Sequence, residues 1–268
     1  IEAALDLGAQ AALRQFSPQG VNRGVLVTAG AANLGNIEPE KLAARIEALR
    51  QQKVAFDACG VGTDGLDDAM LEALARKGDG RYFILGRAED ADAAFARELA
   101  GAFRPAARNV KVQVRFNPDR VGKFHLLGFE KHVLKEEDFR DDKVDAAEMA
   151  AAEEGNALYQ VELRADGQGE IGDVAVRFED VAAGRIVERH WTIPFDPSAA
   201  RLERANPSMQ LAATAGLLAE RLKGSTLGGL VQLDDLTPVV TSLRQHFPAN
   251  PKAAQLVDMV RKTADLTR

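Results

Sequence analysis

Residues 24–35 read GVLVTAGAANLG, and this stretch decides the fold of the chain. The apolar run at residues 25–27 is typical of a parallel strand that is covered on both faces, and the glycines after it predict a turn. Ligands of open α/β sheets bind beyond the carboxyl ends of the strands, so a candidate site lies in residues 28–35. This loop offers one hydroxyl, on Thr28, and one amide, on Asn33. Neither group transfers a proton or holds a cation alone.

Composition predicts a globular protein with two or three domains. The chain has 268 residues, a net charge of -6 and a pI near 5.4. We expect no nucleic-acid partner, because neutralising phosphates needs a basic surface. No segment has the roughly 20 apolar residues that span a bilayer. The single Cys59 ends an apolar strand and is expected to be a small buried thiol.

The first 104 residues alternate helices with strands. Helical periodicity covers residues 1–16, 37–51, 66–76 and 91–103, and short apolar strands cover residues 21–28, 53–59 and 81–85. This alternation predicts βαβ units and a parallel sheet. Three strands are too few for a complete doubly wound sheet, and the first helix has no capping residue before it. We therefore expect an α/β fold with a partial doubly wound, Rossmann-like parallel sheet, the other half of which precedes residue 1.

Near residue 105 the period changes from helical to alternating. Alternating strands are predicted at residues 110–116, 121–127, 157–163, 174–178 and 185–195, and helices return at residues 209–222, 233–245 and 251–267. The strands predict an antiparallel β-sandwich. The predicted domains are therefore the parallel sheet at 1–104, the sandwich at 105–205 and a helical segment at 206–268.

Several segments resemble known families. VLVTAGAANLG at 25–35 resembles the fourth-strand motif of von Willebrand factor type A domains, in which Thr-Asp-Gly ends the strand and Asn-x-Gly follows, and CGVG at 59–62 is similar to the exit of the next strand. Later segments are similar, in order and spacing, to the C-terminal module of the bacterial YfbK-like proteins: NVKVQVRFNP at 109–118, LGFEK at 127–131, DFRDD at 138–142 and VDA at 144–146. The resemblance implies the C-terminal half of a type A domain followed by that module, in a protein of the cell envelope or periplasm.

The type A resemblance implies a metal-ion-dependent adhesion site. Such a site uses an Asp-x-Ser-x-Ser, a Thr from a second loop and the Asp of Thr-Asp-Gly. Ala29 stands where that Asp is expected, and a methyl group cannot bind a hard divalent cation. We therefore expect a degenerate site with no metal and no other cofactor. A divalent cation would bind only if ligands are present upstream of residue 1.

A glycine loop supplies the main alternative. GVGTDG at 60–65 fits the G-x-G-x-x-G pattern of dinucleotide-binding loops between a strand and a helix. Asp64, Asp67 and Asp68 crowd the start of that helix, where a pyrophosphate needs the positive end of the helix dipole, and we expect them to cap it instead. The next strand also ends without the acidic residue that would bind a ribose.

The remaining polar residues show no catalytic arrangement. The acidic run at residues 135–148 lacks the spacing of a calcium loop and is expected to be a solvated loop. The four histidines lack metal-ligand spacing, and the serines have no nucleophile-elbow context.

We therefore predict a non-catalytic module for protein–protein interaction or scaffolding. Its partner is an unidentified protein, and self-association is possible. The predicted binding rim consists of Thr28, Ala29, Asn33, Thr63, Asp64 and Asp67. Two alternatives stay open: a nucleotide-binding enzyme that uses the loop at 60–65, and a purely structural module that assembles with other chains.

Overall fold

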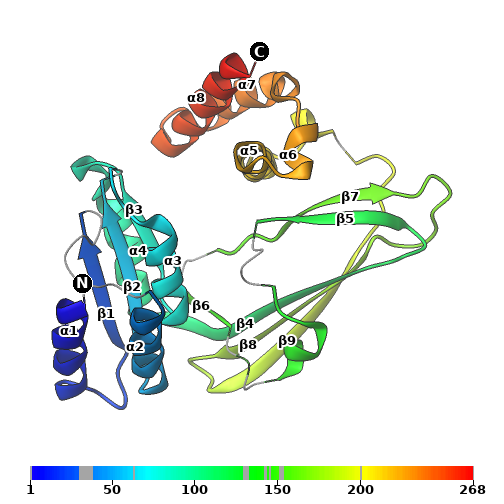
Figure 1. The fold of residues 1–268 in the computed structure, drawn as a ribbon. Helices are drawn as coiled ribbons and strands as arrows, with labels where there is room; N and C mark the ends of the chain where they lie inside the picture. The colour runs from blue at the N-terminus through cyan, green and yellow to red at the C-terminus, as the bar shows by residue number, and fades with distance from the viewer. Residues whose placement is uncertain are drawn as a thin grey trace. The chain divides into compact units, whose positions relative to one another are not determined.

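The computed structural model describes residues 2–29, 39–62, 64–128, 133–141, 144, 146–150, 154–199 and 201–267 (Figure 1). The chain forms two compact units. The first comprises Ile1–Lys111, Asp142–Glu153 and Arg177–Val187, and the second comprises Val112–Asp141, Glu154–Val176 and Glu188–Arg268.

The first unit contains the predicted parallel sheet. Its strands lie in the order β1-β2-β3, and their bounds are β1 Asn22–Thr28, β2 Val54–Val61 and β3 Tyr82–Leu85. Both pairings are parallel, with Thr28 opposite Gly60 and Val61 opposite Leu85. The prediction of a mixed α/β fold with a parallel sheet is confirmed. Within the described residues β1 lies at an edge of this sheet, and Val25 and Val27 are exposed, whereas its apolar run predicted a strand covered on both faces.

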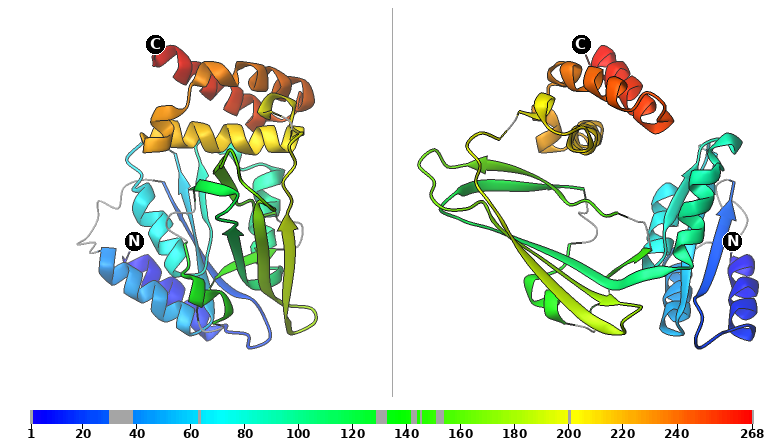
Figure 2. Two further views of the ribbon diagram at one scale, coloured as in Figure 1. Left: turned by 90° about the vertical axis from the view of Figure 1, so that its right-hand side faces the viewer. Right: turned by 180° about the vertical axis from the view of Figure 1, so that it is seen from behind.

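Helices pack against both faces of this sheet. On one face, a core of Leu5, Ile46, Phe56, Leu74 and their neighbours joins β2 to three helices: α1 Glu2–Arg14, α2 Pro39–Gln51 and α3 Asp68–Lys77. Side chains alternate along a strand, so Phe83 of β3 points to the other face. There its ring contacts the ring of Phe95 on α4 (Ala93–Ala102), with the two ring centroids 5.5 Å apart. A short 3-10 helix, η1 (Ala88–Asp90), precedes α4. Figure 2 shows α4 on the side of the sheet away from α2 and α3.

The predicted antiparallel strands are present in two separate sheets. One sheet has the order β6-β4-β8-β9, with bounds β4 Pro105–Phe116, β6 Ala147–Ala150, β8 Gly172–Asp180 and β9 Arg185–Ile193. The other is a ribbon of β5 (Val121–Leu127) and β7 (Leu158–Leu163). The acidic run that predicted a loop contains a short 3-10 helix, η2 (Glu136–Arg140), and the first residues of β6, so that prediction is wrong at both places.

The C-terminal residues form the predicted helices and two short additions. The elements are η3 Leu202–Arg204, α5 Pro207–Lys223, α6 Thr226–Leu230, η4 Leu233–Leu236, α7 Thr237–His246 and α8 Pro251–Leu266. Their core includes Leu218, Val239, Leu243 and Val257. Gly224 ends α5 in the left-handed conformation, at φ 66°, and Ser225 begins α6 as its N-cap. Among the described residues, no helix is both long enough and apolar enough to cross a membrane.

Candidate functional site

The predicted rim lies at the carboxyl edge of the parallel sheet. Because Thr28 pairs with Gly60, the carboxyl ends of β1 and β2 lie side by side. Ala29 and Asp64 are exposed there. Asn33 and Thr63 lie outside the described residues. The structure thus brings Thr28 and Ala29 to the same edge as the 60–65 loop.

The carboxylates next to this rim have local structural roles. Asp67 is the N-cap of α3, and its Oδ1 accepts a hydrogen bond from Met70 N at 3.0 Å, as the sequence predicted. Asp68 Oδ1 accepts a hydrogen bond from the Tyr82 hydroxyl at 2.6 Å. Burial raises the pKa of Tyr82, and the bond to Asp68 raises it further. Tyr82 therefore stays protonated and serves as a donor that ties α3 to β3.

Backbone geometry accounts for the glycines of the 60–65 loop. Gly62 and Gly65 have φ values of 82° and 69°, in the region that favours glycine. A Cβ on Gly60 would lie 2.4 Å from Leu66 Cδ2, so a larger residue at this position would have to displace the Leu66 side chain. Gly62 N donates to Leu85 O at 2.7 Å, which joins the loop to β3. The conformation of this turn therefore accounts for Gly62 and Gly65 of the G-x-G-x-x-G pattern without a bound dinucleotide.

Cys59 is 1% exposed on β2. Burial raises the pKa of its thiol, and a protonated buried thiol is a poor nucleophile. The prediction of a small buried thiol is confirmed.

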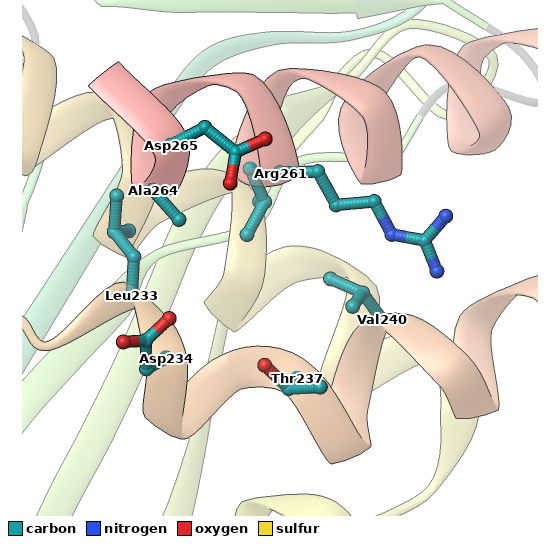
Figure 3. A pocket seen from close by; sticks show the side chains of 8 residues that line it. Leu233, Asp234, Thr237, Val240, Arg261, Ala264 and Asp265 are labelled. Atoms are coloured by element: carbon teal, nitrogen blue, oxygen red, sulfur yellow. The ribbon is translucent and has the colours of Figure 1, made fainter. Parts of the chain in front are cut away.

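A cavity of about 230 Å³ lies in the helical segment, between η4, α7 and α8. Figure 3 shows Asp234 and Thr237 on one side of it and Arg261, Ala264 and Asp265 on the other. The lining also includes three buried apolar residues: Leu233, Val240 and Val260. No sequence pattern indicated this cavity, because its residues come from helices that are separate in the chain. Within the described part of the chain, no three His, Cys, Asp or Glu side chains gather as a metal site.

The first unit holds a cavity of about 280 Å³ with a basic lining. The residues that line it are Asn109, Lys111, Arg177, Phe178, Glu179, Gly184, Arg185 and Ile186. Lys111 is 3% exposed, although the alternating pattern of β4 placed it on the solvent side. Asn109 has a positive φ of 51°, and β4 is irregular between Ala107 and Val110. A bulge there changes which side chains face inward, which a strict alternation misses.

A second buried polar group joins the ribbon to the C-terminal helices. The Glu220 side chain is 2% exposed and accepts hydrogen bonds from Ser225 Oγ at 2.6 Å and Lys223 Nζ at 3.0 Å. His125 Nε2, on β5, lies 3.6 Å from Glu220 Oε2. The Ser225 hydroxyl, above all, lowers the pKa of Glu220. Because Ser225 Oγ also accepts from Gly228 N at 2.9 Å, this cluster is a helix cap and not a nucleophile arrangement.

Comparisons with known proteins identify one family. Residues 101–266 match the model of the family described as "Uncharacterized protein YfbK, C-terminal". The YfbK protein of Escherichia coli (strain K12) is 30% identical over 161 residues, which cover 60% of this chain and 28% of that protein. The match therefore spans well under a third of the relative's length.

Two solved structures share a general likeness. The von Willebrand factor type A protein from Catenulispora acidiphila has a TM-score of 0.44 at 16% identity, covering 96% of this chain and 61% of that one. The human COPII-coat protein Sec24c has a TM-score of 0.40 at 11% identity, covering 95% of this chain and 38% of that one. Scores this low do not establish a shared fold. The family model, in contrast, covers residues 101–266 of 268, and the chain belongs to the YfbK C-terminal family.

Proposed function

We propose that this chain is a non-catalytic protein-interaction module and that its partner binds at the carboxyl edge of the parallel sheet. One observation carries the proposal: small and apolar side chains are exposed there beside Asp64, while the neighbouring carboxylates of Asp67 and Asp68 have structural roles. Val27 is 64% exposed and Ala29 is exposed beside it. Asp67 caps α3 and Asp68 holds Tyr82. Such a surface suits contact with a protein better than acid–base chemistry.

The proposal extends to the fold of the parallel and antiparallel sheets. We take the parallel sheet as part of a doubly wound type A domain and the antiparallel strands as a sandwich. Ala29 then occupies the position of a metal-binding carboxylate, and the adhesion site is degenerate. The support is the motif at residues 25–35, the parallel order β1-β2-β3, and membership of the YfbK C-terminal family. Residence in the cell envelope is proposed on the family resemblance alone.

Site-specific photocross-linking tests the proposal. A photoreactive residue is placed at Ala29 or at Asp64 in the natural protein inside its host cell. Gln10, exposed on α1, provides a matched control position in the same unit. We expect both rim positions to cross-link to the same protein and Gln10 not to do so. Equal cross-linking from all three positions would contradict a specific rim.

A ligand screen separates this proposal from the nucleotide-binding alternative. Melting of the chain with and without NAD or ATP should show no shift, because α3 begins with a capping carboxylate where a phosphate would sit. A saturable rise in Tm that Gly62→Ala abolishes would favour the enzyme.

A further inference from the structure

The last strand of the four-stranded antiparallel sheet has an open side. In the order β6-β4-β8-β9, no strand among the described residues follows β9, and Figure 2 (left) shows β9 at the margin of the sheet. Residues 188–193 of β9 belong to the second unit. An edge of this kind presents backbone N–H and C=O groups that can pair with another chain. The stretch reads ERHWTI and has no proline to block such pairing.

One face of this segment is occupied by contacts within its own unit. Glu188 Oε1 accepts a hydrogen bond from Arg140 Nη2 at 2.8 Å. The same oxygen lies 2.8 Å from His190 Nε2. Thr192 Oγ1 donates to Asp173 Oδ1 at 3.2 Å. Side chains alternate along a strand, so Arg189 and Trp191 project together from the opposite face.

Trp191 supplies an apolar anchor on that face. It is the single tryptophan of the chain, and 52% of its surface is exposed. Tryptophan and arginine are the residue types that most often dominate binding energy at protein interfaces. Arg189, two residues away and exposed, provides the second of these types.

The charges along this segment favour an acidic partner. Arg140 holds the pKa of Glu188 down to about 2, mainly through its hydrogen bond, and the Glu188 charge is thereby paired. Arg189 then gives the exposed face a positive charge, in a chain whose net charge is -6. Charge complementarity at an interface selects the partner more than it raises affinity.

We propose that residues 188–193 bind an extended acidic peptide segment by β-strand addition. The main chain of the guest bonds to the open side of β9. An apolar guest side chain covers Trp191, and a guest Asp or Glu two residues away pairs with Arg189. Because Arg189 and Trp191 are themselves two residues apart on one face, the guest needs an acidic and an apolar residue in the same spacing, whichever direction it runs. Main-chain bonds give the affinity and the two side chains give the specificity.

Synthetic peptides test the proposal on the full chain. The probe is a fluorescein-labelled ten-residue peptide that alternates Thr and Val and carries one Glu two residues from a Val. A second peptide has Lys in place of the Glu. Two further peptides carry N-methyl groups on the amides of one edge or of the opposite edge. Anisotropy gives the affinity, and the emission of Trp191 reports burial of the ring.

The acidic peptide should bind about tenfold more tightly than the Lys peptide, and Arg189→Glu should reverse that order. Trp191→Ala should weaken binding about tenfold, a loss typical of an interface anchor. N-methylation of the edge that faces β9 should abolish binding, whereas methylation of the other edge should not. Leu266→Ala, which truncates an 87% exposed leucine on α8, is the control and should change nothing.

Three results would overturn the proposal. The first is equal affinity for the acidic and Lys peptides, and the second is undiminished binding of both N-methylated peptides. The third is a Trp191 emission that shifts with protein concentration alone, which would mean that a second copy covers β9. Because the probe does not contact Ala29 or Asp64, failure here leaves the rim proposal standing, and failure of the rim proposal leaves this one standing.

Discussion

Arg23 and Asp57 form a buried ion pair between the first two parallel strands. Arg23 Nη1 lies 2.7 Å from Asp57 Oδ1, and the two side chains are 2% and 0% exposed. The same oxygen accepts a hydrogen bond from Arg81 N, just before β3, at 2.7 Å. Asp57 therefore links all three strands of the sheet through one carboxylate.

Removal of this carboxylate should destabilise the first unit strongly. Asp57→Ala leaves the Arg23 charge buried without its carboxylate, and such a loss costs about 3 to 5 kcal/mol in the free energy of unfolding. Arg45→Ala is the matched control, because Arg45 pairs with Glu2 and Asp6 at the surface and should cost at most about 1 kcal/mol. Urea denaturation followed by circular dichroism measures both. Equal losses of stability in the two variants would mean that burial of the Arg23–Asp57 pair adds nothing to the free energy of unfolding.

The hydrogen bond from Ser225 to Glu220 should make stability depend on pH. A carboxyl whose pKa is lowered in the folded state stabilises the protein above its unfolded pKa, near 4.5, and that stability is lost as pH falls through the folded pKa. Ser225→Ala removes this bond and the N-cap, and should cost about 1 to 3 kcal/mol at pH 7. The difference from the native chain should narrow as pH falls below 4.5 and through the lowered pKa of Glu220 in the folded chain.

Ser198→Ala is the control for this measurement. Ser198 Oγ also donates to a carboxylate, Asp196 Oδ1, at 2.6 Å, but both residues are exposed. Denaturation midpoints between pH 3 and 8 should show little change for this variant. A pH-independent loss in Ser225→Ala would assign the whole effect to the cap.

Two adjacent glycines of α6 should respond oppositely to alanine. A Cβ on Gly228 would lie 1.9 Å from the Glu220 backbone oxygen, so Gly228→Ala must push α6 away from α5. We expect a loss of more than about 2 kcal/mol, typical of an overpacked core. Gly229 has no atom within 4 Å of the corresponding position, and Gly229→Ala should be neutral or stabilising by up to about 1 kcal/mol. Thermal melting compares them, and similar Tm values for the two variants would contradict the close approach of α6 to α5.

Alternation and capping signals were enough to predict most of the fold. The parallel strands, their helices and the C-terminal helices follow from periodicity and from residues such as Asp67 and Gly224, which act locally. The short strand β6 was missed because four residues beside an acidic run carry too little pattern. Its position depends on pairing with β4, which is a long-range contact.

The buried polar groups were less predictable than the strands. Asp57 is a charged residue within the apolar strand VAFDACGV, and that contrast was a usable signal for a buried pair. Nothing local identifies Arg23 as its partner, 34 residues away. The exposed aromatic edge at Trp191 also needed the strand order, because the same sequence in a central strand would be covered.

The rim should bind no divalent cation in this chain. Ala29 has no carboxylate or other side-chain oxygen, so calorimetric titration with Mg²⁺, Mn²⁺ or Ca²⁺ should show no saturable heat at micromolar concentrations. Ala29→Asp should raise the affinity only in a protein that contains upstream ligands. Micromolar binding that disappears when Asn33 is replaced would refute the prediction.

Strand β1 exposes apolar side chains at an edge of the parallel sheet. Val25 and Val27 are 37% and 64% exposed on β1, which is an edge strand within the described residues. A regular edge with exposed β-branched side chains favours pairing between chains. We expect residues 1–268 to be insoluble or to dimerise through residues 25–27. Residues 105–268, which lack β1, should be soluble and monomeric.

Val27→Lys tests this edge directly, because a charge on an edge strand opposes pairing with a second copy. We expect the dimer to dissociate about tenfold more readily, which corresponds to about 1.4 kcal/mol. Leu7→Lys, at a 68% exposed leucine on α1, controls for a general gain in solubility. Sedimentation velocity over a range of concentrations measures the association of both variants. If residues 1–268 are monomeric and melt cooperatively with β1 at a free edge, an edge of this composition is tolerated and self-association through residues 25–27 is wrong.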